Sequence, residues 1–329
     1  MTEIVVAVGE LARFCYRRGD IDHRFSPSPT GAEGTAGHQR VYRQRPASYR
    51  SEVALEHLQQ VAGQALVLRG RADGYDPDEG VLEEIKTCRV PFSRIPQTLS
   101  QWHLAQARLY AGILALQAGL PALTVRLTWF NIDTGEEQSL SQHYTRDELV
   151  DFLQSSLARF ADWLATLAAL REQRDASAAA LPFPHGEFRR GQRDIAEQVY
   201  RCIARGGQLL LEAPTGIGKT AAVLFPAIKA FGRDIHEVVV YVTAKTVGRR
   251  SAEQTLALLR EAGYRGCALT LSARDDVCLS PGHACHGDDC PYARGYYDKL
   301  PGAMAAAIAA PVLSRDALVA LAREHAVCP

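Results

Sequence analysis

A glycine-rich loop in the middle of the chain has the residues that bind phosphate groups. Residues 212–220 read Glu-Ala-Pro-Thr-Gly-Ile-Gly-Lys-Thr and lie between an apolar run and a helix-forming segment. The glycines let backbone N–H groups turn toward phosphate oxygens, and the following helix N-terminus favours negative charge. Lys219 would reach the β- and γ-phosphates, and the Thr220 hydroxyl would bind Mg²⁺. The pattern predicts an ATP site at Ala213, Pro214, Thr215, Gly216, Ile217, Gly218, Lys219 and Thr220. The alternative is a glycine turn without a ligand.

Four of the eight cysteines lie in the last part of the chain, at Cys278, Cys285, Cys290 and Cys328. The N-terminus lacks a signal-peptide pattern, so we expect a reducing compartment, in which clustered cysteines bind metal. Cys290 and Cys328 each precede a proline, as in iron–sulfur motifs, and the short C-x2-C pairs usual for zinc are absent. An iron–sulfur site is predicted. Zinc and no metal are the alternatives, and Cys267 is a possible substitute for Cys278.

The N-terminal half carries an acidic residue and a Glu-x-Lys triplet on two expected strands. Asp73 follows the first strand, and Glu84, Ile85 and Lys86 lie in the second. Alternation along a strand puts Glu84 and Lys86 on one face. Asp73 and Glu84 could share Mg²⁺ or Mn²⁺, with the Ile85 carbonyl as a further ligand, while Lys86 orients or deprotonates the attacking water. This arrangement resembles the core of PD-(D/E)XK nucleases. The alternative is a polar hairpin face, which often contains the same residue pattern without a catalytic role.

Two further features are similar to those of RecB-like nucleases. Gln106 and Tyr110 form a Q-x-x-x-Y pattern, and residues four apart share a helix face that can point at the rim of an active site. His38 resembles the upstream histidine of that family, which can complete the metal shell. A solvated loop histidine is the alternative. Glu52 and Glu56 are interpreted as ordinary charges on a helix face.

The second half resembles XPD/DinG-like superfamily 2 helicases. Their phosphate loop begins with Ala, as here at Ala213; Arg189 and Gln192 resemble the R-x-x-Q element that contacts adenine. Residues 243–246 resemble motif Ia, which implies single-stranded DNA contacts by Thr243, Lys245 and Thr246; a strand-to-helix cap is the alternative. Residues 271–278 and 325–329 resemble the segments that carry the ligands of that family's iron–sulfur domain. The resemblance implies a [4Fe–4S] cluster that shapes the DNA pore.

The composition is that of an ordinary globular protein. The 329 residues include 37 basic and 37 acidic side chains, and 47% are apolar. This balance excludes disordered, collagen-like and histone-like chains, and no apolar stretch approaches the roughly 20 residues of a membrane span.

The periodicity predicts the elements that must position these residues. Helices are expected at 3–18, 48–62, 98–118, 146–172, 190–206, 219–231 and 251–263. Strands are expected at 64–69, 81–87, 123–131, 208–212 and 237–243, with a turn across 76–80 and a linker within 173–187. Strands that alternate with helices after residue 190 predict a parallel sheet.

The expected fold class is α/β. A RecB-like PD-(D/E)XK nuclease domain at 1–175 and a linker at 176–187 would precede the first part of a RecA-like motor at 188–266, with an iron–sulfur insertion at 267–329. The chain would be a truncated, cytoplasmic, monomeric DNA helicase-nuclease of repair or recombination, acting on single-stranded or branched DNA. Because the later motor motifs are missing, we expect weak nucleotide binding without efficient ATP hydrolysis. The alternative is a DNA-binding module with a degenerate nuclease fold.

Overall fold

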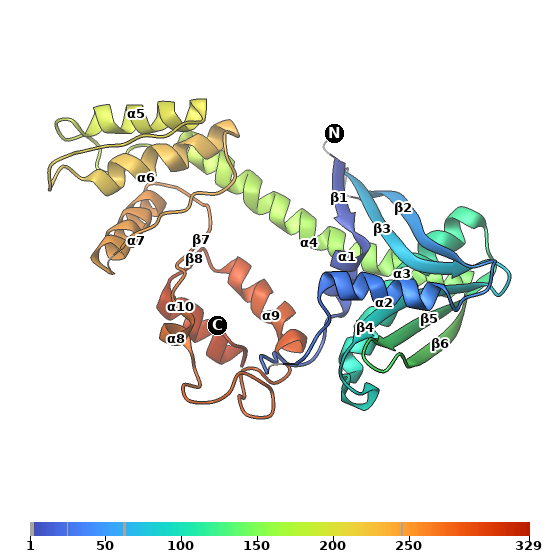
Figure 1. Ribbon diagram of the computed structural model, residues 1–329. Coiled ribbons are helices and arrows are strands. Elements are labelled where there is room, and N and C mark those ends of the chain that lie inside the picture. Colours follow the sequence, from blue (N-terminus) through green and yellow to red (C-terminus); the bar gives the residue numbers. More distant parts are fainter. Residues whose placement is uncertain (1–2, 25, 62–63, 245) are drawn as a thin grey trace. The chain divides into compact units, whose positions relative to one another are not determined.

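The computed structural model describes residues 3–24, 26–61, 64–244 and 246–329 (Figure 1). It divides into two compact units. The first comprises Met1–Ala165, Leu279–Pro301 and His325–Cys328, and the second comprises Thr166–Cys278, Gly302–Glu324 and Pro329. Both helices and sheet are present, so the α/β class expected from the sequence is confirmed. Among the described residues, no helix is long and apolar enough to cross a membrane.

The first unit is built on one mixed sheet, which contains six strands within the described residues. The strands are β1 (Glu3–Ala7), β2 (Arg50–Val61), β3 (Gln64–Asp76), β4 (Val81–Cys88), β5 (Ala122–Asn131) and β6 (Glu137–Thr145). Their order is β1-β3-β4-β5-β6, and β2 also pairs with β3. β1 with β3 and β4 with β5 are parallel pairs; the remaining pairs are antiparallel.

Helices cover both faces of this sheet. The helices are α1 (Val8–Tyr16), α2 (Gly31–Tyr42), α3 (Gln97–Ala118) and α4 (Arg146–Ala180), with a 3-10 turn η1 (Phe92–Arg94). The part of α4 from Thr166 onward belongs to the second unit. Leu11 of α1, Leu109 of α3 and Leu149 of α4 belong to one apolar core with the inner side of the sheet. α2 packs on a second, smaller core through Val41, which contacts Ile85 and Phe130. α2 and α3 thereby face β4 from two apolar cores, and β4 carries Glu84 and Lys86.

The second unit is mostly helical. Its elements are α5 (Gln192–Arg205), α6 (Lys219–Lys229), η2 (Ala230–Arg233), α7 (Thr246–Glu261), the short parallel pair β7 (Ala268–Leu269) and β8 (Val312–Leu313), α8 (Arg274–Val277) and α10 (Arg315–Glu324). α9 (Tyr296–Ala309) spans the boundary between the units. α5 packs on α6 through Ile195, Val199 and Ala222.

Several expected elements differ from the structure. The helix predicted over 3–18 begins as strand β1, because the β-branched run Ile4-Val5-Val6 pairs with β3. The helix predicted over 48–62 is strand β2, in which Val53 and Leu55 pack on the core at a spacing of two. The segments 208–212 and 237–243, predicted as strands, have no regular secondary structure. The helix α4 continues to Ala180 rather than ending near residue 172.

Candidate functional site

The structure brings together the acidic and basic residues of β3 and β4. Asp73 accepts a hydrogen bond through Oδ2 from the backbone amide of Ile85, at 2.6 Å. The neighbouring residues on β4 form an ion pair, with 2.6 Å between Lys86 Nζ and Glu84 Oε1. The two strands separate beyond the last paired residue, Gly74 of β3, so Asp73 faces the middle of β4. The contact to Ile85 uses its amide, whereas the sequence suggested a role for its carbonyl.

Burial sets the electrostatics of this pair. The Glu84 side chain is 3% exposed, and burial raises its pKa to about 7, against the opposing effect of the Lys86 ammonium. Burial also disfavours the charge on Lys86, but the Glu84 carboxylate outweighs it and raises the Lys86 pKa. Glu84 Oε2 is buried and has no hydrogen-bond partner. An unpaired buried carboxylate oxygen is costly, so this atom is suited to a cation or a proton.

His38 of α2 lies beside Asp73. Its Nδ1 is 3.4 Å from Asp73 Oδ1. Burial disfavours the imidazolium, but the hydrogen bond and charge of Asp73 outweigh it and raise the His38 pKa. The sequence placed this histidine in a loop before a helix, whereas it lies within α2 itself. Three elements, α2, β3 and β4, therefore contribute to the site.

Gln106 and Tyr110 approach the same site from α3. Tyr110 is buried and hydrogen-bonded to Gln106, and burial together with the nearby Glu84 charge raises its pKa to about 12. Its ring lies directly over Gly70, where an added Cβ would be 2.6 Å from Tyr110 Cε1. The sequence missed His103, one turn earlier on α3. Burial and the Lys86 charge lower the His103 pKa to about 3, and its Nδ1 is a buried atom without a partner.

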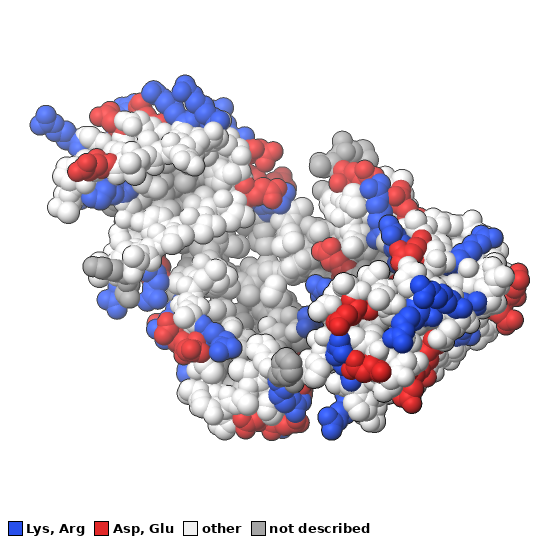
Figure 2. All heavy atoms as spheres, viewed as in Figure 1, with Lys and Arg blue, Asp and Glu red and all other residues white. Residues whose placement is uncertain are grey.

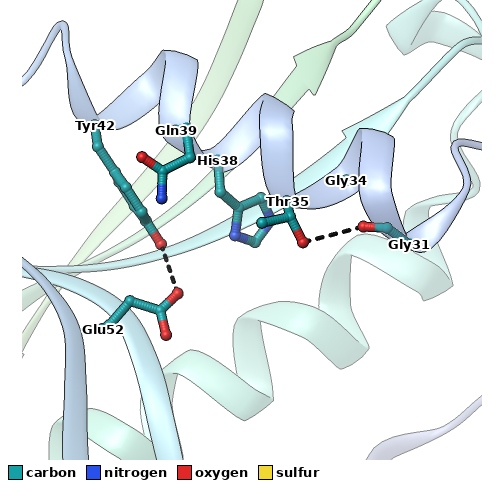
Figure 3. A pocket seen from close by; sticks show the side chains of 7 residues that line it. All are labelled: Gly31, Gly34, Thr35, His38, Gln39, Tyr42 and Glu52. Atoms are coloured by element: carbon teal, nitrogen blue, oxygen red, sulfur yellow. Dashed lines mark hydrogen bonds between the residues drawn. The ribbon is translucent and has the colours of Figure 1, made fainter.

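A cavity of about 280 Å³ adjoins His38 (Figure 3). Tyr42 and Gln39 of α2 line it, and Glu52 of β2 faces them across the opening. The Tyr42 hydroxyl donates to the Glu52 carboxylate at 3.3 Å. Glu52 lies on a strand, which corrects the helix-face interpretation drawn from the sequence; the same holds for Glu56.

The glycine-rich loop of the second unit precedes α6 in the expected manner. Gly216 and Gly218 both have positive φ, 81° and 82°, a backbone conformation that favours glycine. Lys219 Nζ donates to the carbonyls of Ala213 and Pro214, at 2.8 and 3.0 Å. The lysine therefore contacts carbonyl oxygens of its own loop. Thr220 Oγ1 lies 3.0 Å from Ser251 Oγ of α7, a residue that the sequence did not single out.

The Arg189 and Gln192 element contacts this loop. Arg189 donates through Nη1 to the Gly216 carbonyl at 2.9 Å, and Gln192 donates through Nε2 to the Gly218 carbonyl at 3.2 Å. The element and the loop therefore form one local structure, although they are more than 20 residues apart. Of the expected DNA-contacting residues, Thr243 precedes α7 and Thr246 begins it. Lys245 lies outside the described residues.

The four C-terminal cysteines are distributed over both units. Cys285, Cys290 and Cys328 belong to the first unit and Cys278 to the second. The Cys328 amide donates to the Tyr292 carbonyl at 3.1 Å, which brings residue 328 back to the segment that carries Cys285 and Cys290. None of the described cysteines forms a disulfide. Across the described residues, no three His, Cys, Asp or Glu side chains form a group that could hold a metal ion.

Charges of both signs are interspersed over the first unit on the face drawn in Figure 2. The strand β3 shows the same balance, because Arg69 pairs with Glu56 and Arg71 pairs with Glu52 on the exposed β2 side. This surface matches the zero net charge of the whole chain.

Comparison with known proteins supports a helicase motor. The sequence model of the DEAD/DEAH box helicase family matches residues 193–275, which include the glycine-rich loop. The chain is also similar to the probable ATP-dependent helicase MJ0942 of Methanocaldococcus jannaschii, with 41% identity over 46 residues. That similarity covers 14% of this chain and 7% of the relative.

One solved structure, titled "Crystal structure of SSO0001", overlaps 48% of this chain and 77% of its own, at 16% identity and a TM-score of 0.32. This overlap is too low to establish a shared fold. The family match, by contrast, supports a helicase-type domain over residues 193–275.

Proposed function

We propose that the chain is part of a DNA helicase-nuclease, in which Asp73, Glu84 and Lys86 form a Mg²⁺- or Mn²⁺-dependent phosphodiesterase site. The observation that carries the proposal is the pairing of buried Glu84 with Lys86 next to Asp73. Two carboxylates and a lysine on adjacent strands are the residue types that such hydrolysis needs.

The residues fit a magnesium ion. Mg²⁺ is commonly bound by one or two carboxylates and keeps several waters, so it does not require three protein ligands. Glu84 Oε2 is buried without a partner, and Asp73 Oδ1 lies 3.4 Å from His38 Nδ1. Asp73 and Glu84 would hold the ion, with His38 at its edge. When bound, the ion would polarise the scissile phosphate and lower the pKa of a bound water.

The other residues of the site have distinct roles. Lys86 holds a positive charge beside Glu84, where it would orient the attacking water and stabilise charge that develops on the phosphate. Gln106 and Tyr110 would position the phosphate group at the rim. The buried, un-ionised Tyr110 can donate a hydrogen bond, because its pKa is about 12.

The decisive experiment measures cleavage of labelled single-stranded DNA by the purified chain with Mg²⁺, Mn²⁺ and EDTA. We expect cleavage that needs the divalent ion and falls at least about 100-fold in Asp73→Asn and in Lys86→Met. The control is Asp78→Asn, which changes the same functional group at the exposed turn of the β3–β4 hairpin. Absence of cleavage with either ion in the wild-type chain would instead favour a DNA-binding module without nuclease chemistry.

The motor half is proposed to bind ATP at Lys219 and Thr220 and to translocate on single-stranded DNA in the complete protein. Arg189 and Gln192 would lie next to the adenine, and Thr243, Lys245 and Thr246 would contact the DNA backbone. The contacts of Arg189 and Gln192 with the glycine-rich loop support a shared nucleotide site. Isothermal titration with ATP and Mg²⁺ tests it: Lys219→Met should weaken binding, while Arg201→Met, on the exposed face of α5, should not.

The cysteines are proposed to hold a [4Fe–4S] cluster. Thiolates are the usual ligands of such clusters. The Cys328 backbone amide is hydrogen-bonded to the Tyr292 carbonyl, next to Cys290 in the segment that also contains Cys285. Cys278 is proposed as the fourth ligand on the sequence spacing alone. Anaerobically purified protein should be brown and contain about four iron atoms per chain. Colourless protein with stoichiometric zinc would exclude the cluster.

A further inference from the structure

The cavity beside His38 is open because of the composition of α2. This helix contains three glycines, although glycine is the least favourable residue in a helix interior after proline. Gly37 is required by packing, because an added Cβ would lie 2.6 Å from Thr87 Cγ2. Gly31 and Gly34 have no such requirement: a Cβ would meet nothing at Gly31 and only Thr87 Oγ1, at 3.4 Å, at Gly34. Both residues line the cavity, and the absence of side chains at these two positions of α2 leaves space that larger residues would fill.

The opposite wall is held in an unusual conformation. Glu52 has a φ of 59°, which side chains with a Cβ rarely adopt. It lies between the β2–β3 pairs Ser51–Gly74 and Val53–Ala72, directly across from Asp73. Its carboxylate is fixed by the Tyr42 hydroxyl at 3.3 Å and by Arg71 at 2.7 Å. Strained residues persist where the surroundings hold them and are frequent at binding sites.

The cavity and the proposed nuclease site share a residue. His38 lines the cavity, and its Nδ1 is 3.4 Å from Asp73 Oδ1. A nucleotide whose phosphate lies at Asp73 and Glu84 would therefore have the cavity within the reach of its own base. This step rests on the proposed nuclease function, which supplies the phosphate position.

The chemistry of the walls selects the occupant. The seven lining residues include no Lys or Arg, and Glu52 carries a carboxylate, so the cavity does not suit a phosphate group. The His38 and Tyr42 rings, with centroids 6.2 Å apart, offer aromatic surface, and the Gln39 amide offers both a donor and an acceptor. Its volume of about 280 Å³ is slightly below the range for pockets that bind drug-sized ligands, roughly 300–1,000 Å³, so it suits a smaller group.

We propose that this cavity binds one unstacked nucleobase, that of the nucleotide next to the scissile phosphate, and favours a base that carries an exocyclic amino group. The amino group of adenine, cytosine or guanine can donate to the Glu52 carboxylate. Thymine has no amino group, and its one ring N–H donor, at N3, lies between two carbonyl oxygens that a carboxylate repels. The base stacks on an aromatic ring, as in other single-strand binding proteins.

Binding in EDTA tests the cavity without cleavage. The probes are a labelled oligothymidine, the same oligomer with one central adenine, and one with a central abasic site. We expect the adenine oligomer to bind the wild-type chain about tenfold more tightly than the other two, as one stacked and hydrogen-bonded base contributes elsewhere. Gly34→Leu fills the cavity and should remove this difference. Gly34→Ala adds a Cβ alone, which meets Thr87 Oγ1 at 3.4 Å, and should keep it.

Gln39→Ala provides a second variant, since this side chain is exposed and its removal leaves the core of α2 intact. It should reduce the preference without loss of helix content. Equal affinity of the wild-type chain for all three oligomers, or a preference that persists in both Gly34→Leu and Gln39→Ala, would overturn the proposal. Cleavage of the same oligomers with Mg²⁺ separates the two ideas. A base preference without cleavage refutes the proposed nuclease and supports base binding in the cavity. Cleavage without a base preference supports the nuclease and refutes base binding in the cavity.

Discussion

Two substitutions of the same kind, three residues apart on α2, are expected to change stability in opposite directions. Gly34→Ala and Gly37→Ala each replace glycine by the best helix former, a gain of about 1 kcal/mol in a helix interior. At Gly34 the new methyl makes only an ordinary contact, 3.4 Å from Thr87 Oγ1. We therefore expect Gly34→Ala to stabilise α2 by about 0.5–1 kcal/mol.

At Gly37 the packing term dominates. The methyl would lie 2.6 Å from Thr87 Cγ2, 3.3 Å from Ile132 Cγ2 and 3.4 Å from Phe130 Cδ1. The first distance is well inside van der Waals contact, and Gly37 is buried, so the helix, β4 or the Thr87 side chain must move. Overpacking of this kind costs about 1–3 kcal/mol, which exceeds the propensity gain. Gly37→Ala should thus destabilise the helix by up to about 2 kcal/mol.

The assay is hydrogen exchange of peptides within residues 31–42, because the chain has two compact units and a single unfolding free energy is not defined for it. Thr87→Ser removes the obstructing Cγ2 and supplies the control. The double variant Gly37→Ala/Thr87→Ser should be at least about 1 kcal/mol more stable than the sum of the two single-variant effects predicts. If Gly37→Ala protects α2 as well as Gly34→Ala does, the close packing of α2 on β4 is wrong.

The remaining predictions concern buried charges of the first unit. Arg45 pairs with fully buried Glu83 at 2.8 Å. Arg45→Met should therefore lower the free energy of unfolding of this unit by about 3–5 kcal/mol, measured by urea unfolding followed by tryptophan fluorescence. Adding Glu83→Gln should recover much of this loss, because it removes the unpaired buried charge. Burial opposes the Glu83 charge, but Arg45 outweighs it and lowers the Glu83 pKa; the stabilisation is therefore complete above about pH 4.5 and is lost as the pH falls through the folded pKa. The pKa of His103 is lowered from 6.5 to about 3, so the free energy of unfolding should decrease as the pH falls from 6.5 to 3, by at most about 1.4 kcal/mol per pH unit. His103→Asn should flatten this part of the stability profile. An unchanged profile in this variant would contradict the burial of the imidazole.

The sequence predicted best those elements whose signals are local. The β3–β4 hairpin was expected from its turn at 76–80 and α3 from its helical spacing. β4 and α3 lie within one residue of their predicted bounds, whereas β3 continues to Asp76 rather than ending at residue 69. Because strand alternation fixes side-chain direction, Glu84 and Lys86 lie on one face and form the predicted neighbours. The approach of Gln106 and Tyr110 from α3 follows from the same local periodicity.

Elements that depend on distant partners were not predicted. β2 contains Glu, His and Gln between its apolar residues, a pattern compatible with a helix, and its strand form follows from pairing along the whole of β3. The cavity wall at Glu52 depends on that pairing and on Arg71, so it has no local signal. His103 could have been noticed because it precedes Gln106 by three residues and so shares its helix face.

The second unit shows why an apolar run alone does not make a strand. Leu210 is fully exposed, and Val238, Val240 and Val242 are each more than two-thirds exposed, although their sequences resemble buried strands. β3 has a comparable apolar run at residues 66–68, but it is hydrogen-bonded on both sides, by β1 and β2. Backbone N–H and C=O groups need such partners, so a strand is a property of a pair rather than of a segment. The DEAD/DEAH helicase similarity covers both apolar runs, and because it rests on sequence, it does not depend on whether these runs pair as strands.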